Sequence, residues 1–129
     1  MKKLLILLFS ILISFNSYGE WTEITISNTG NTHYIDNSSF KENNGYIYWW
    51  ELNDYLIPSE WGDMSDKQYK QGDCKVNRYK ILSFIFHKQS MGIGIGEQSV
   101  PLGSNGDWNY PSPGTVGTHL INHACNLRN

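Results

Sequence analysis

The two cysteines of the chain, Cys74 and Cys125, carry the chemistry that is easiest to predict. A single pair of cysteines in an exported protein is usually oxidised to a disulfide, and the N-terminal segment described below indicates export. The bridge would stabilise the fold by ~4 kcal/mol, because it restricts the unfolded chain. Two free thiols or half of a metal site are the alternatives, although two sulfurs without a paired spacing argue against a metal.

Two histidines, His119 and His123, are four residues apart, so a helix would place both on one side. A zinc site needs at least one further ligand. Leu120 occupies the position at which the HExxH motif of metalloproteases has its glutamate. No serine lies in a recognisable nucleophile motif with a base arranged around it. We therefore expect no metal ligand, no cofactor and no catalytic residue in this chain.

Three alternating glycines, Gly92, Gly94 and Gly96, have some likeness to a nucleotide-binding loop. Such loops open a helix whose N-terminus meets the phosphate, but no helical pattern follows here. The glycines instead predict a last strand over residues 91–98, flattened or bulged, against which another backbone packs.

The N-terminal segment indicates the compartment in which these residues fold. Lys2 and Lys3 precede an apolar run over residues 4–13, and small residues follow at Ser17 and Gly19. This pattern predicts a signal peptide over residues 1–19, followed by one domain over residues 20–129. The run is too short to span a bilayer comfortably, and no cysteine lies near the cut to carry a lipid. We expect export to the periplasm, the cell surface or the medium, without a transmembrane segment or a lipid anchor.

The charge of the exported part excludes one class of partner. The chain has 10 Lys and Arg residues against 12 Asp and Glu residues, and Lys2 and Lys3 belong to the predicted signal peptide. The remainder has a formal charge of −4 and no basic patch of the kind that binds DNA or RNA.

The central element that must position these residues is a strand over residues 45–55, which reads GYIYWWELNDY. Aromatic and β-branched residues alternate along it with period two. We expect the face with Trp50 to point into the core, together with Tyr46, Tyr48 and Leu52. Ile47 and Trp49 would then lie on the opposite face, where they would form either an exposed protein-contact patch or a layer buried beneath a loop.

The rest of the chain predicts more strands and one helix. Residues 21–27 and 33–35 should be strands, with a single helical turn after Asp36. Residues 67–73 and 75–88 predict two further strands, or one strand bent near Gly72. The nearly continuous apolar run over residues 79–86 indicates a central strand covered on both faces.

The last element is a helix, for which Ser112 can cap and Pro113 suits the first position. Val116, Leu120 and Ala124 recur at four-residue spacing, and Cys125 lies beside that stripe. The predicted fold class is therefore α+β: an antiparallel sheet of about five to six strands, with a C-terminal helix packed on one face and one disulfide.

A set of landmarks recurs in one order through nearly the whole exported part. They are Trp21, Tyr34-Ile35-Asp36, Ser39-Phe40-Lys41, Gly45, Trp50-Glu51-Leu52, Asp54-Tyr55, Ser65, Lys67, Asp73-Cys74-Lys75, Arg78-Tyr79-Lys80-Ile81-Leu82, Met91-Gly92, Gly94, Trp108, Pro113-Gly114-Thr115-Val116-Gly117 and Ala124-Cys125. This order resembles the surface-adhesin protein E family of exported Gram-negative proteins.

The resemblance implies an antiparallel sheet with a C-terminal helix, export, and in the adhesin members the binding of host extracellular-matrix proteins. We therefore predict a non-enzymatic exported domain that binds a host matrix protein or another surface protein, and a homodimer is compatible with this function. The alternative from the binding class is a periplasmic module for a small ligand or an envelope protein, which would have an enclosed apolar pocket. The alternative from the enzyme class is a hydrolase, which would have a cleft where a titratable group with a shifted pKa meets a hydroxyl.

Overall fold

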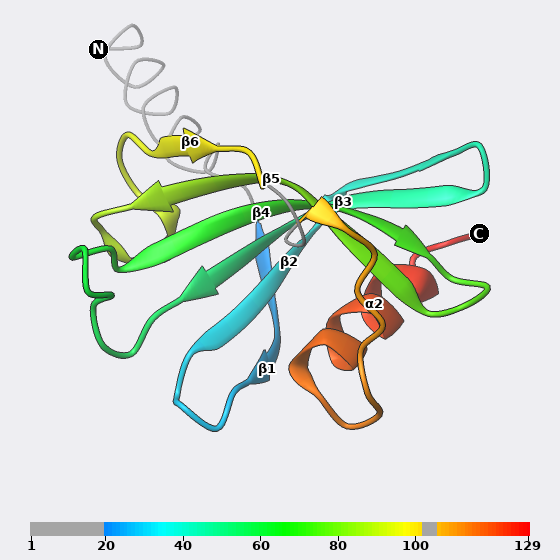
Figure 1. The fold of residues 1–129 in the computed structure, drawn as a ribbon, viewed down its shortest axis with the longest axis horizontal. Helices are drawn as coiled ribbons and strands as arrows, with labels where there is room; N and C mark the ends of the chain where they lie inside the picture. Colours follow the sequence, from blue (N-terminus) through cyan, green and yellow to red (C-terminus); the bar gives the residue numbers. More distant parts are fainter. Residues whose placement is uncertain (1–19, 102–105) are drawn as a thin grey trace, which may run out of the picture.

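Six antiparallel strands follow one another across a single sheet, each hydrogen-bonded to its neighbours in sequence order (Figure 1). The computed structural model describes residues 20–101 and 106–129, so the predicted signal peptide, residues 1–19, lies outside the described residues. The elements are β1 (Trp21–Ile26), β2 (Thr32–Asn43), β3 (Tyr46–Asp54), β4 (Ser65–Asp73), β5 (Arg78–His87), the short 3-10 helix η1 (Ser90–Gly92), β6 (Glu97–Ser99) and the helix α2 (Val116–Asn126). The predicted α+β class is confirmed.

The C-terminal helix lies against the β1–β3 half of one face of the sheet, away from β6 (Figure 1). It begins later than Ser112 and Pro113 suggested, because the Thr115 hydroxyl caps it by accepting a hydrogen bond from the Thr118 N–H. The disulfide between Cys74 and Cys125 is present, with the two Cα atoms 5.9 Å apart. It fastens the last turn of the helix to the turn that follows β4.

The face of β3 that points into the core is the one opposite to our prediction. Ile47 and Trp49 lie beneath the helix, where they pack with Ile35 and with Leu120 and Ile121 of α2. Successive residues of a strand point to opposite faces, so Trp50 lies on the far side of the sheet and is only partly buried. We call the side with Trp49 the helix face and the side with Trp50 the open face.

The segment after Asp36 is strand and not the predicted helical turn. β2 continues through it, with a register shift against β3 between Asp36 and Lys41. The Asp36 carboxylate does accept hydrogen bonds from the Ser38 N–H (3.0 Å) and hydroxyl (2.6 Å), so the polar side chains stabilise a bulge here.

The glycine-rich segment after β5 is a loop folded over the open face, and β6 begins only at Glu97. The prediction of a strand from residue 91 was therefore wrong, although the close approach of another segment is real. A Cβ atom on Gly92 would lie 2.5 Å from Lys67 Cε and 3.3 Å from Leu52 Cδ1. Gly92 also has φ +64°, which glycine adopts readily. Leu52 is fully buried beneath this loop.

The apolar strand β5 lies next to the edge of the sheet and is not central. Its outer neighbour β6 pairs with only three of its residues, from Phe84 to Phe86. The helix contacts mainly the other half of the sheet, so the side chains of β5 before His87 are only partly buried. Part of the helix face over β4–β6 is consequently open to solvent.

Candidate functional site

The predicted contact patch at Ile47 and Trp49 is not exposed. Ile47 is 2 % exposed and Trp49 is 0 % exposed, because α2 covers them. The Trp49 indole N–H is also satisfied internally, since it donates to Glu51 Oε1 at 3.0 Å. The residues that could contact a partner must therefore be sought elsewhere.

The open face of the sheet presents a cluster of aromatic rings that are only partly buried. Trp50 and Tyr69 are cross-strand neighbours, and their ring centroids are 5.0 Å apart. Tyr48 extends the cluster, with its ring 6.2 Å from that of Tyr69. Trp21 lies at the β1 end of the same cross-strand row, opposite Asp36, and is also partly exposed. This aromatic cluster (Trp50, Tyr69 and Tyr48) forms the centre of the open face.

Cationic side chains flank a second group of rings next to this cluster. Trp108 packs against Tyr46, with their ring centroids 5.7 Å apart. The Arg78 guanidinium lies 4.1 Å from the centre of the Trp108 ring, and Lys80 Nζ lies 4.7 Å from it. Tyrosine, tryptophan and arginine are the residues that most often dominate binding at protein interfaces.

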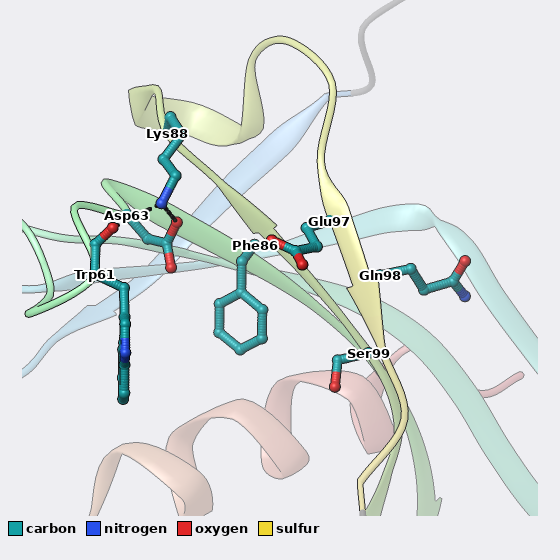
Figure 2. A pocket seen from close by; sticks show the side chains of 7 residues that line it. All are labelled: Trp61, Asp63, Phe86, Lys88, Glu97, Gln98 and Ser99. Carbon is teal, nitrogen blue, oxygen red and sulfur yellow. Dashed lines mark hydrogen bonds and ion pairs between the residues drawn. The ribbon is translucent and has the colours of Figure 1, made fainter.

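A groove lies on the helix face, in the part that the helix leaves uncovered (Figure 2). It has a volume of about 620 Å³ and opens to solvent. In Figure 2 the rings of Trp61 and Phe86 point into it from the same side of the sheet, while β6 forms the opposite wall with Glu97 and Ser99. A smaller hollow of about 270 Å³ shares Trp61 and Phe86, so the Trp61 ring stands between two depressions.

An ion pair holds one wall of this groove in place. Lys88 Nζ lies 3.0 Å from Asp63 Oδ1 and donates to the Trp61 carbonyl at 2.7 Å. The lysine thus links the end of β5 to the β3–β4 loop. Trp61 itself is 75 % exposed, which is unusual for so large an apolar side chain.

A buried polar network lies under the smaller hollow. The Asp66 carboxylate accepts hydrogen bonds from Asn53 Nδ2 (2.9 Å), from Gln68 Nε2 (3.1 Å) and from the Tyr55 hydroxyl. Burial raises the pKa of Asp66 above its ordinary value. Burial and the contact with Asp66 likewise raise the pKa of Tyr55.

This network has a titratable group beside a hydroxyl, which is the feature expected of the hydrolase alternative. Its chemistry is nevertheless that of a structural contact. The Tyr55 hydroxyl uses its proton to donate to Asp66, which ties the two groups together. Both Asp66 oxygens already accept hydrogen bonds, and the residue is only 5 % exposed, so the carboxylate is engaged within the fold.

The two histidines of the helix do not converge on a metal site. His119 is exposed, and His123 Nε2 lies 2.7 Å from Asn37 Oδ1. Within residues 20–101 and 106–129, no group of three or more His, Cys, Asp or Glu side chains is arranged to hold a metal ion. Across the same residues, no helix has both the length and the apolar character needed to cross a bilayer.

The groove could not be predicted from the sequence, because its residues come from separate segments. Trp61 lies in the β3–β4 loop, Phe86 lies near the end of β5 and Glu97 begins β6. No spacing rule connects them, and Trp61 has no periodic pattern around it. The one available signal was a tryptophan in a loop otherwise rich in polar and turn-forming residues.

Comparison with known proteins supports the fold and places the chain in a family. A crystal form of Haemophilus influenzae protein E matches with a TM-score of 0.60 at 18% identity, over 81% of this chain and 87% of that one. A selenomethionine form of the same protein matches with a TM-score of 0.55 at 20% identity, over 81% and 84% of the two chains. Protein E from non-typeable H. influenzae matches with a TM-score of 0.51 at 19% identity, over 80% and 72%. At these identities the likeness concerns the fold.

A comparison with curated proteins finds no match. The family model described as "Surface-adhesin protein E", in contrast, matches residues 21–126. That match includes every strand of the sheet and the whole of the helix α2. The chain therefore belongs to the surface-adhesin protein E family.

Proposed function

We propose that this chain is an exported, non-enzymatic domain that binds another protein through its open face. Membership in a family of surface adhesins supports export and a binding role. The single observation that carries the choice of surface is the aromatic cluster of Trp50, Tyr69 and Tyr48, which is left partly exposed on the side of the sheet away from the helix.

The physical argument is that these rings offer binding energy that the fold has not used. Rigid aromatic side chains bury a large area at a small entropic cost, because they have few rotatable bonds. They already pack on one another, so little further ordering is needed when a partner arrives. Arg78 and Lys80 beside Trp108 add cations at the margin, where they can orient a partner.

The partner that we propose is a host extracellular-matrix protein or another surface protein. Two further parts of the proposal are a cleaved signal peptide over residues 1–19 and a single domain over residues 20–129, in the periplasm or at the cell surface.

A periplasmic module for an envelope protein is the second candidate. The groove beside Trp61 favours it, because a hollow lined by aromatic rings suits a defined envelope partner.

The test is a binding titration of the exported protein against purified matrix proteins, measured by surface plasmon resonance. We expect the variants Trp50→Ala and Tyr69→Ala each to weaken binding by about tenfold or more, as central aromatic anchors do. Val76→Ala, which changes an exposed apolar residue in the turn between β4 and β5, is the control and should leave this affinity unchanged.

Circular dichroism of each variant must accompany the titration, because Trp50 and Tyr69 also support the sheet. Normal binding by well-folded Trp50→Ala and Tyr69→Ala proteins would refute the open face as the contact surface. Binding to none of the matrix proteins, together with a specific complex in an envelope fraction, would favour the periplasmic candidate. Sedimentation of the protein without any partner would show whether it self-associates, and so would distinguish a homodimer from binding to a matrix or envelope protein.

A further inference from the structure

We propose that the groove beside Trp61 is a second binding site, which takes an arginine or lysine side chain from an extended segment of a partner protein. This proposal rests on the proposed function in one respect only, namely that the partner that occupies the groove is a protein. It concerns the opposite side of the sheet and different residues, so either proposal can fail without the other.

The walls of the groove have the chemistry of a site for a cation. The Trp61 and Phe86 rings both point into the groove in Figure 2. Phe84 stacks on Phe86, with the ring centroids 5.6 Å apart, and this fixes the orientation of the Phe86 ring. The faces of aromatic rings attract cations, and tryptophan does so most strongly. A flat guanidinium group can stack on such a ring while its donors remain free for an oxygen acceptor.

The charges around the groove favour the same occupant. Asp63, Lys88 and Glu97 line it, and the Lys88 ammonium is already engaged by Asp63 Oδ1 and by the Trp61 carbonyl. Among the described residues, no hydrogen bond or ion pair engages the Glu97 carboxylate, which points toward Phe86 in Figure 2. The open charge at the groove is therefore negative.

The same charges argue against an apolar occupant. An apolar chain pressed into the groove would remove Glu97 from water without giving it a partner, which costs free energy. A cationic side chain would instead supply the partner and would stack its apolar stem against the rings. The groove also opens to solvent, so an extended segment can reach it.

The experiment uses two short peptides: one contains arginine residues, and the other has citrulline, a neutral analogue of the same shape with an oxygen in place of one nitrogen, at the same positions. Binding to the ¹⁵N-labelled exported protein is followed by NMR, through the indole N–H signal of Trp61. We expect the arginine peptide to shift this signal and to bind at least about threefold more tightly than the citrulline peptide. High salt should reduce the difference.

Variants then test the named residues. Trp61→Ala should weaken binding of the arginine peptide by about threefold or more, and Glu97→Gln by about twofold or more. Glu23→Gln changes an exposed acid on β1, at the other edge of the sheet, and should have no effect. The indole N–H signal of Trp50 reports on the open face in the same spectra and should not shift with the peptide, so failure here is distinguishable from failure of the open-face proposal.

Three outcomes would overturn the proposal. One is equal binding of the arginine and citrulline peptides. Another is arginine-dependent binding that Trp61→Ala and Glu97→Gln leave intact while both variants remain folded. The third is preferential binding of a glutamate-containing peptide or of phosphatidylcholine vesicles, which would assign the groove to a different class of ligand.

Discussion

Glu51 and Lys70 form an ion pair on the helix face, where Lys70 Nζ lies 2.7 Å from Glu51 Oε2 and both side chains are almost completely buried. The pair is embedded in aromatic contacts. Trp49 donates its indole N–H to the other Glu51 oxygen, and Lys70 Nζ lies 4.3 Å from the centre of the Tyr79 ring. Each charge therefore depends on the other, since water cannot reach either one.

Removal of one partner of this pair should be costly. Lys70→Met leaves the Glu51 carboxylate buried without a counter-charge, and we expect the free energy of unfolding to fall by ~3–5 kcal/mol. Urea denaturation at neutral pH, followed by tryptophan fluorescence, measures the loss. The double variant Glu51→Gln with Lys70→Met should recover a large part of it, because no unpaired charge remains. A single variant as stable as the parent would show that the pair contributes little.

Loss of the disulfide should destabilise the whole domain and not only the helix. The bridge joins residues 51 apart in sequence, for which the chain-entropy estimate is ~4 kcal/mol. We expect Cys74→Ser with Cys125→Ser to lower the free energy of unfolding by about that amount, since the helix contributes Leu120 and Ile121 to the core. Guanidinium denaturation of the parent, with and without reductant, gives an independent measure. Equal midpoints under both conditions would contradict the expectation.

The sequence predicted the fold well where the signal was local. The strand over residues 45–55 is an example, because its period-two pattern is local and β3 spans Tyr46–Asp54. The disulfide followed from a count of two cysteines. The choice of buried face on β3 failed, because both faces are apolar and periodicity alone cannot rank them. That choice is made by Leu120 and Ile121 of the helix, which pack with Trp49 although they are 71 and 72 residues away in the sequence (120 − 49 and 121 − 49).

The candidate sites were harder to predict than the fold for a related reason. The aromatic cluster joins Trp50 to Tyr69 through strand register, which depends on the pairing of β3 with β4. The groove joins Trp61, Phe86 and Glu97 across three segments. A functional surface made by pairing of distant strands leaves no short motif in the sequence, whereas a strand or a helix does.

Truncation of the two adjacent tryptophans of β3 should lower stability to different extents. Trp49 is fully buried in the core, so Trp49→Ala should lower the free energy of unfolding by ~3–5 kcal/mol. Trp50 is partly exposed, so Trp50→Ala should cost clearly less stability. Thermal unfolding followed by circular dichroism compares the two variants directly. A larger loss for Trp50→Ala would mean that the assignment of the two faces is reversed.

The buried carboxylate of Asp66 should make stability depend on pH in a defined direction. Burial raises the pKa of Asp66, so the folded state binds its proton more tightly than the unfolded state does. Stability from this group is therefore fully present below the ordinary aspartate pKa, and it is lost as the pH rises through the raised pKa of the folded state. The variant Asp66→Asn cannot titrate at this position and should lack that loss.

The measurement is the difference in free energy of unfolding between the parent and Asp66→Asn, taken by urea denaturation at intervals from about pH 3 to pH 7. Burial also lowers the pKa of His87, and that group pulls in the opposite direction, since it favours folding at higher pH. Both proteins contain His87, so the difference between them isolates Asp66. We expect the parent to lose stability relative to the variant as the pH rises. A relative gain would show that the hydrogen bonds from Tyr55, Asn53 and Gln68 outweigh the cost of burying the charge.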